Sequence, residues 1–150
     1  MANIVETVIH RSNGEVVRQI GENLRTNGGK QWQANQMAGS PTTICIHMGV
    51  GGDNTAPISA DTNLVGEFAA NGLSRLTGTF AYTASASTYT LTGTWVYIGS
   101  SATTVEKACI ATGLTNLDSS ADTHFCMTLL SPAASLTSGD TLVINWGIGF

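Results

Sequence analysis

The sequence predicts a mainly β protein: a single antiparallel β-sandwich or jelly-roll-like domain with one or two short helices and an N-terminal arm. Three observations lead to this prediction. Residues 141–150 place large apolar side chains at every second position, which is the period of a strand with one buried face. Residues 76–97 alternate in the same way around a Thr/Ser-rich loop, and at least six short strands are separated by turn residues. We expect residues 1–24 to form the arm or a hairpin, and residues 25–150 to form the sandwich domain.

The N-terminal segment has the pattern of two short strands. Residues 4–9 are rich in β-branched side chains, Ser12-Asn13-Gly14 is a turn signal, and residues 15–20 resume the apolar pattern. A helix over residues 15–25 is the alternative. The mixed charge of the segment suits contact with a partner surface. The residues expected to make that contact are Ile4, Val8, Arg11, Val16 and Arg18.

A short helix is predicted over residues 26–39. Thr26-Asn27 can cap its N-terminus, and Gly39 can end it. Two glycines weaken the first turn, so the helix requires packing against the rest of the protein. Trp32 and Met37 are its predicted apolar anchors.

Residues 43–48 form the next predicted strand, followed by a loop over 49–54 whose glycines would supply positive φ angles. A brief helix over 62–69 would place Leu64 and Phe68 four residues apart and facing inward. After these elements the chain is predicted to be almost entirely β.

The clearest hairpin joins residues 76–82 to 88–97, where apolar residues alternate with threonine. Further strands are predicted at about 104–111, at about 123–130 and at the C-terminus, the last one after a turn over 137–140. The expected structural core includes Trp32, Leu64, Phe80, Trp95, Leu142, Trp146 and Phe150.

Charged residues are only 11% of the chain, against about 25% in an average protein. A weakly charged surface desolvates easily, which favours packing against other protein. Seven of the sixteen charged residues lie in residues 1–30, and the remainder has a net charge of −5. The sequence shows no basic patch with interleaved aromatics, so no nucleic acid partner is predicted. We also expect no membrane association and no usual export signal, because there is no long apolar run.

The three cysteines are expected to be reduced and mostly buried. Cys45-x-His47 and His124-x-Cys126 are the one arrangement with metal-ligand chemistry, because residues i and i+2 of a strand share a face. If the two strands were neighbours, four ligands suited to zinc would converge. The spacing matches no common zinc module, so the favoured interpretation is core or interface packing, without metal or cofactor.

No catalytic site is predicted. The Gly-Val-Gly-Gly run at 49–52 lacks the third glycine of a dinucleotide-binding loop, and it lacks the lysine of a phosphate-binding loop. There is no Gly-x-Ser-x-Gly motif. The carboxylates are scattered, and none has the apolar surroundings of an acid–base pair.

Several motifs follow one another along residues 23–150. Residues 23–30 have the pattern N-L-x-T-N-x-G at the entry of the predicted helix, and residues 46–52 form a strand ending in G-x-G. The stretch from Thr55 to Leu64, with Glu67 and Arg75, has the pattern T-A-P-x-x-x-D-T-x-L-x-x-E…R. These motifs, in this order, resemble those of a group of tailed-bacteriophage virion proteins.

Two further segments complete the resemblance. Residues 105–110 are similar to an I-x-E-A-G-L/I strand, with Lys107-Ala108-Cys109 in place of E-A-G. Residues 138–150 resemble a terminal G-D-T-L-x-V-x-W-x-I-x-F. Residues 1–22 match no part of the group.

The resemblance implies a structural role in the virion rather than enzymatic work, after assembly in the host cytoplasm. We expect a capsid decoration (cement) protein that stabilises a phage head through subunit contacts. Its expected partners are copies of itself, with a trimer favoured, and the major capsid protein or another virion protein. One alternative is a tail, collar or head-fibre component. Another is a carbohydrate-binding β-sandwich module that uses Trp95, Tyr97 and Tyr89 as a stacking platform.

Overall fold

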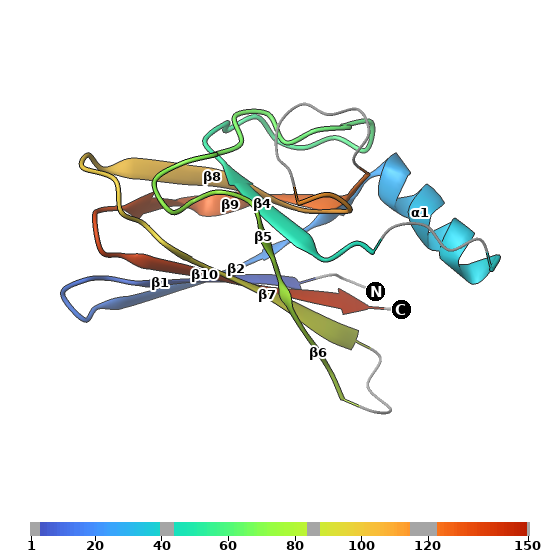
Figure 1. Cartoon of the computed structure of the whole chain (residues 1–150), viewed down its shortest axis with the longest axis horizontal. Helices are drawn as coiled ribbons and strands as arrows, with labels where there is room; N and C mark the ends of the chain where they lie inside the picture. Colours follow the sequence, from blue (N-terminus) through green and yellow to red (C-terminus); the bar gives the residue numbers. More distant parts are fainter. Residues whose placement is uncertain (1–3, 40–43, 84–87, 115–122, 150) are drawn as a thin grey trace.

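The computed structural model describes residues 4–39, 44–83, 88–114 and 123–149 (Figure 1). It contains ten strands and one helix within this part of the chain. They are β1 (Ile4–His10), β2 (Val16–Glu22), β3 (Leu24–Arg25), α1 (Asn27–Met37), β4 (His47–Gly51), β5 (Leu76–Thr77), β6 (Thr79–Tyr82), β7 (Thr88–Val96), β8 (Thr103–Ala111), β9 (His124–Leu136) and β10 (Thr141–Gly149).

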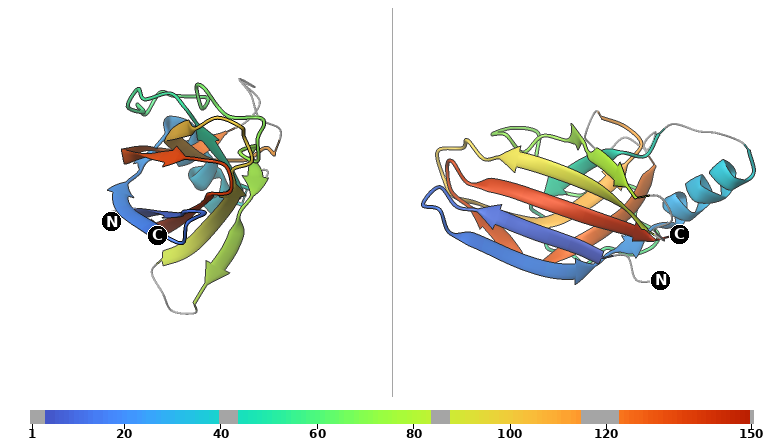
Figure 2. Two further views of the ribbon diagram at one scale, coloured as in Figure 1. Left: turned by 90° about the vertical axis from the view of Figure 1, so that its left-hand side faces the viewer. Right: turned by 90° about the horizontal axis from the view of Figure 1, so that it is seen from below.

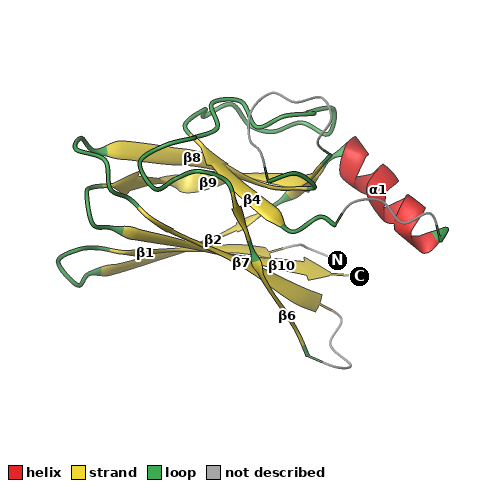
Figure 3. Ribbon diagram, viewed as in Figure 1, coloured by secondary structure: helices red, strands yellow, loops and turns green. Residues whose placement is uncertain are grey.

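These strands form two antiparallel sheets that face each other, with α1 at one end (Figure 3). Sheet A has the order β2-β1-β10-β7-β6, and sheet B has the order β3-β9-β8-β4-β5. The mainly β fold, with a short helix and two layers, confirms the predicted β-sandwich class. The side chains between the two sheets form the main core.

Two runs of chain pass from one sheet to the other. Only Asn23 separates β2 from β3, and only Gly78 separates β5 from β6. In Figure 1, β5 and β6 run from the upper sheet to the lower one. A Cβ at Gly78 would lie 2.7 Å from the Leu91 side chain and 2.9 Å from that of Met48, so the crossing requires glycine. If β2 with β3, and β5 with β6, are each counted as one strand, the chain has eight strands. The first pairs with the last, the second with the seventh, the third with the sixth and the fourth with the fifth, which is jelly-roll-like winding.

The N-terminal segment is a hairpin, as one reading predicted, but it is not a separate arm. β1 pairs with β2 on one side and with β10 on the other, each over seven residues. Val5 and Ile9 point into the core and are each 2% exposed. The separation into an arm over 1–24 and a sandwich from 25 is therefore wrong, because β1 lies inside sheet A. The helix considered over 15–25 is also wrong, since β2 and β3 occupy that range.

Helix α1 confirms the predicted helix and its cap. The Thr26 hydroxyl accepts a hydrogen bond from the Gly29 N–H at 3.0 Å. Gly29 allows the helix to approach β9, where a Cβ would collide with the Phe125 carbonyl. Trp32 is half-buried and packs edge-on against Phe125, with ring centroids 5.5 Å apart. Met37 is 83% exposed, so it is not an anchor; it is the last residue of a helix that projects from the sandwich (Figure 1).

The glycines after the third predicted strand serve a different purpose from the expected one. The strand lies at 47–51, so Gly49 and Gly51 belong to β4, and neither has a positive φ. A Cβ on Gly49 would lie 2.5 Å from a carboxylate oxygen of Glu67, and one on Gly51 would lie 3.0 Å from the Gly66 carbonyl. These glycines therefore permit the close approach of a neighbouring segment.

That segment, 64–68, contains no helix, which corrects the prediction for 62–69. It runs beside β4 instead, with the Gly52 N–H bonded to the Gly66 carbonyl at 3.0 Å and the Phe68 N–H bonded to the Val50 carbonyl at 2.9 Å. Leu64 is 2% exposed and Phe68 packs against the main core, so the inward direction of both side chains is confirmed. The bonds to β4 replace those that a helix would have made within itself.

The core predictions divide into two groups. Leu64, Trp95, Leu142 and Trp146 are buried, with exposed fractions of 2% or less. Phe80 is 56% exposed and is not a core residue, because β6 extends beyond the area that sheet B covers (Figure 1). Phe150 lies outside the described residues.

Candidate assembly surfaces

The outer face of sheet A is a broad surface with no other described element over it (Figure 2, right). A line of polar side chains crosses it from β2 to β7. Arg18 lies 3.3 Å from Glu6, the Asn145 amide donates to Glu6 at 2.9 Å, and the Thr92 hydroxyl donates to Asn145 at 2.9 Å. The ion pair is largely exposed and contributes under about 1 kcal/mol. The line leaves this face with few unpaired charges.

The five predicted arm residues are separated by the fold. Ile4 is 51% exposed and Val16 is 47% exposed, on the same face of hairpin β1–β2 as the exposed Arg18. Val8 is 4% exposed and Arg11 is committed to an ion pair with Asp140. The hairpin thus offers a fixed row of contact residues rather than a free arm.

Asp140 holds the turn of this hairpin against the start of β10. Its carboxylate accepts bonds from the N–H groups of Ser12 at 2.8 Å and Thr137 at 2.9 Å, and from Arg11 at 2.9 Å. Burial raises the pKa of the Asp140 carboxyl, but the bonds from Thr137, Ser12 and Arg11 outweigh it, so the net pKa lies well below the ordinary value. Asp140 therefore acts as an anionic clamp between two connections of the fold.

Part of the chain between β4 and β5 covers the outer face of sheet B, where Leu64 packs with Cys109 and Met127, and a buried ion pair fixes this cover. Arg75 makes two bonds of 2.7 Å to the Glu67 carboxylate and a third of 2.8 Å to the Gly113 carbonyl. Both charged side chains are 2% exposed. The carboxylate lies over Gly49, which has no side chain to displace it. Removal of one partner would leave a buried charge, so this pair has a structural role.

A second ion pair fixes the same cover nearer its edge. The Lys107 ammonium lies 2.6 Å from Asp53, and the Lys107 side chain is 4% exposed. The hydrogen bond from Lys107 lowers the pKa of the Asp53 carboxyl, with burial opposing it and Thr55 assisting. A cavity of about 200 Å³ lies beside this pair, and one of about 320 Å³ lies between residues 59–62, the start of α1 and the start of β9. The charges that line the first cavity already have partners.

The candidate zinc ligands do not form one site. β8 lies between β4, which begins at His47, and β9, which carries His124 and Cys126, so these two strands are not neighbours; Cys45 precedes β4. Cys45 and Cys126 belong to the main core, whereas His47 lies 3.1 Å from Thr77 and His124 lies 3.4 Å from Arg75. No group of three metal-binding side chains occurs among the described residues.

The three cysteines are reduced and buried, as predicted. Burial, with smaller contributions from the neighbouring thiols, raises the pKa values of Cys45 and Cys126 well above the ordinary range. A neutral, buried thiol is a poor metal ligand and a poor nucleophile. Packing is therefore the role that their surroundings support.

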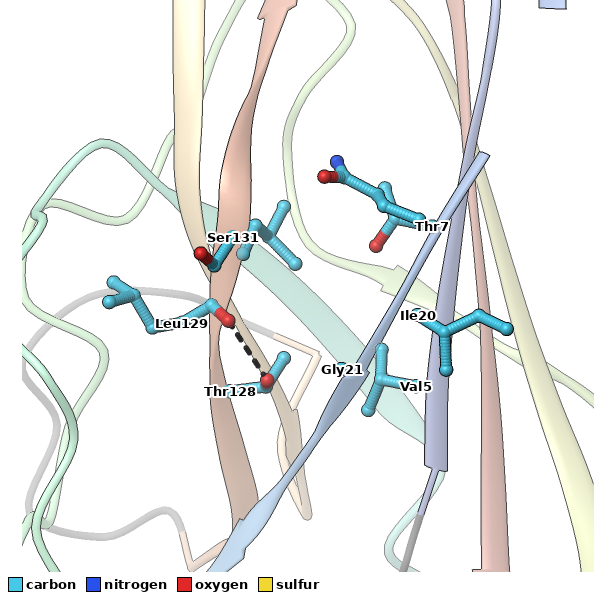
Figure 4. Close-up of a pocket in the computed structure, with 9 residues that line it drawn as sticks. Val5, Thr7, Ile20, Gly21, Thr128, Leu129 and Ser131 are labelled. Carbon is cyan, nitrogen blue, oxygen red and sulfur yellow. Dashed lines mark hydrogen bonds between the residues drawn. The ribbon is translucent and has the colours of Figure 1, made fainter. Parts of the chain in front are cut away.

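A small cavity of about 10 Å³ lies between β2 and β9 (Figure 4). Val5, Thr7, Ile20 and Thr128 are among the residues around it. The cavity has room for about one water molecule. It is too small to bind a substrate.

Two of the three aromatic residues proposed as a sugar platform are buried. Trp95 is 2% exposed and donates to the Ser74 carbonyl at 3.0 Å, and Tyr97 is 4% exposed. Trp95 and Tyr97 are therefore not available to stack on a sugar ring, whereas Tyr89 is half-buried. Burial raises the pKa of Tyr89 to about 12, which is consistent with its half-buried position.

Different aromatic residues are exposed on hairpin β6–β7. Phe80 is 56% exposed and Tyr82 is 48% exposed. Phe80 packs against Tyr89, with ring centroids 5.2 Å apart. Sequence alternation could not identify them as exposed, because Phe80 and Tyr82 lie on the same face of sheet A as the buried Leu91.

Comparison with protein-family models, curated proteins and solved structures finds no match to this chain. Within the described residues, no helix has the length and apolar character needed to cross a membrane.

Proposed function

We propose that this chain is a non-enzymatic structural protein of a tailed-bacteriophage virion, and specifically a capsid decoration protein that stabilises the head through subunit contacts. The observation that carries the proposal is the outer face of sheet A with hairpin β6–β7. This surface is broad, rich in threonine, and poor in unpaired charge. Such a surface loses little hydration energy when it packs against protein.

The position of the motif residues also supports a structural role. Glu67 and Arg75, which belong to the virion-like sequence pattern, form the buried pair that fixes the cover of sheet B. Gly49 and Gly51, within the G-x-G element of the pattern, make room for that cover. The motif residues therefore pack segments of the fold together, as is expected if a capsid or tail accessory protein has a structural role.

The proposed partners are further copies of the chain, with a trimer as the favoured assembly, and the major capsid protein or another virion protein. The exposed row on hairpin β1–β2, which contains Ile4, Val16 and Arg18, is a candidate contact with such a partner. A tail, collar or head-fibre position would use the same surfaces. The number and place of the copies in the particle separate these positions.

Cryo-electron microscopy of the parent particle tests the proposal directly. Density for this sandwich repeated over the head is the expected result. One ring of copies at the neck or tail would favour the alternative position. Absence of the chain from purified, intact particles would contradict a virion role of either kind.

A further inference from the structure

Sheet edges present unpaired N–H and C=O groups, and natural sheets protect them with charges, prolines or covering segments. Most edges of this sandwich have such protection. β2 carries Arg18 and Glu22, and the part of β9 that extends beyond β3 carries Pro132. β4 is covered beyond β5 by the 64–68 segment through the backbone bonds described above.

Within the part of the chain that the structure describes, the edge strand β6 has none of these protections. It is the last strand of sheet A, and all four of its residues are exposed. It contains no charge and no proline, and the nearest charged residues along the chain are Arg75 and Glu106. Its two aromatic side chains, Phe80 and Tyr82, are each about half exposed. An exposed, uncharged and aromatic edge has the composition of a strand that pairs with another strand.

We propose that β6 is a subunit contact that pairs antiparallel with β6 of a second copy of this chain. Directly opposite residues of antiparallel strands share a face of the sheet. A pairing centred on Ala81 therefore places Phe80 of each copy opposite Tyr82 of the other, on one face. The result is two aromatic cross-strand pairs, and the two sheets A become one continuous sheet.

Charge and symmetry favour a second copy over another partner. The strand offers no charge for a charged partner to complement, and its sequence is complementary to itself in the register centred on Ala81. The net charge of −4 opposes association only weakly at this edge, because the hairpin itself is neutral. A self-complementary patch is what a two-fold contact between identical subunits requires. Such a contact closes a pair, so it would join one copy of a trimer to a copy of another trimer and would not build the trimer itself.

This inference rests on the proposed assembly role for its place in the particle, while the pairing itself is a property of the isolated chain.

Ala81→Cys tests the pairing, because a contact centred on Ala81 brings the two new thiols within disulfide range. Thr90→Cys is the matched control: Thr90 lies opposite Ala81 on β7, on the same face but one strand from the edge. The three native cysteines are buried, so they contribute little background.

On mild oxidation of the purified full chain, Ala81→Cys should form a covalent dimer about tenfold faster than Thr90→Cys, because pairing gives its thiols a high effective concentration. Equal rates for the two variants would overturn the proposal. In sedimentation, Ala81→Lys should lose the concentration-dependent pairing of two chains, or of two trimers, that wild type and Thr90→Lys retain, with circular dichroism confirming that both variants fold. A wild-type chain that stays monomeric at every concentration would also overturn it.

The same variants separate this inference from the proposed function. If the chain is absent from particles but Ala81→Cys still cross-links in solution, the virion role is contradicted and the strand pairing is supported. A chain that is present in particles but shows no Ala81→Cys cross-link would remove the strand pairing and leave the virion role. Cross-linking of Ala81→Cys to a different virion protein would show that the edge binds another partner and would overturn the second-copy assignment.

Discussion

The hairpins at the two edges of sheet A differ in how they are held and in what they expose. Hairpin β1–β2 lies in the charge-rich residues 1–30, where Arg18 pairs with Glu6 and Arg11 pairs with Asp140, the residue before β10. Hairpin β6–β7 has no charge and exposes aromatic rings at its edge strand. High charge density here marks a segment that is fixed within the fold, whereas the absence of charge marks the less protected edge. The comparison teaches that charge density alone does not show which of the two hairpins is the contact surface.

Of the changes that test this comparison, deletion of residues 1–22 should have the largest effect on the stability of the fold. It removes both strands of the charged hairpin, together with the core residues Val5 and Ile9, and exposes the edge of β10. We expect the truncated chain to lose cooperative thermal unfolding, measured by circular dichroism. A truncated chain that melts cooperatively would show that the hairpin is dispensable, as a docking arm would be.

Trp146→Ala should destabilise the strand that joins the two hairpins. Trp146 is fully buried and pairs with Val5 on one side and Leu91 on the other. Loss of a large aromatic from a packed core costs about 3–5 kcal/mol. Asn145→Ala is the control on the opposite face, and it should cost about 1 kcal/mol because it removes hydrogen bonds to Glu6 and Thr92. Equal free energies of unfolding for the two variants in urea would contradict the register of β10.

The clamp at Asp140 should make the attachment of the charged hairpin sensitive to acid. The folded-state pKa of Asp140 lies below the ordinary value of 3.8, so its stabilising contribution is complete above that pH. The contribution is lost as the pH falls from the ordinary value toward the folded-state pKa. Urea unfolding between about pH 2 and pH 7 should therefore show a steeper loss of stability for wild type than for Asp140→Asn. Parallel curves would mean that Asp140 titrates alike in both states.

Phe80→Thr and Tyr82→Thr should have the smallest effect on stability. Both rings are about half exposed, so each change should cost under about 1 kcal/mol in the isolated chain. Ile9→Thr, in the other hairpin, should cost more than about 2 kcal/mol because Ile9 is in the core. A large loss for Phe80→Thr would show that the aromatic edge belongs to the core, as the sequence first predicted.

Alternation predicted much of the fold because each strand has one face against the other sheet. Leu142 and Trp146 are buried as the period of two requires, and the Thr26 cap begins a helix because its hydroxyl lies close to the Gly29 N–H. The candidate assembly residues were less predictable. Val8 and Val16 occur in one apolar pattern, yet one is buried and the other is about half exposed. Their exposure depends on which strands and side chains surround them, and local sequence does not specify those neighbours.

The sequence by itself determined the class of fold, most of its strands, the capped helix and the reduced cysteines, because these follow from local periodicity, capping chemistry and an odd cysteine count. Only the tertiary structure decided that residues 4–22 are part of sheet A, that Gly49 lies beneath Glu67, and that Phe80 is exposed. Each of these depends on contacts between residues far apart in the chain. An alternating pattern shows that a strand has two different faces, but it does not show how far the opposite sheet extends over one of them.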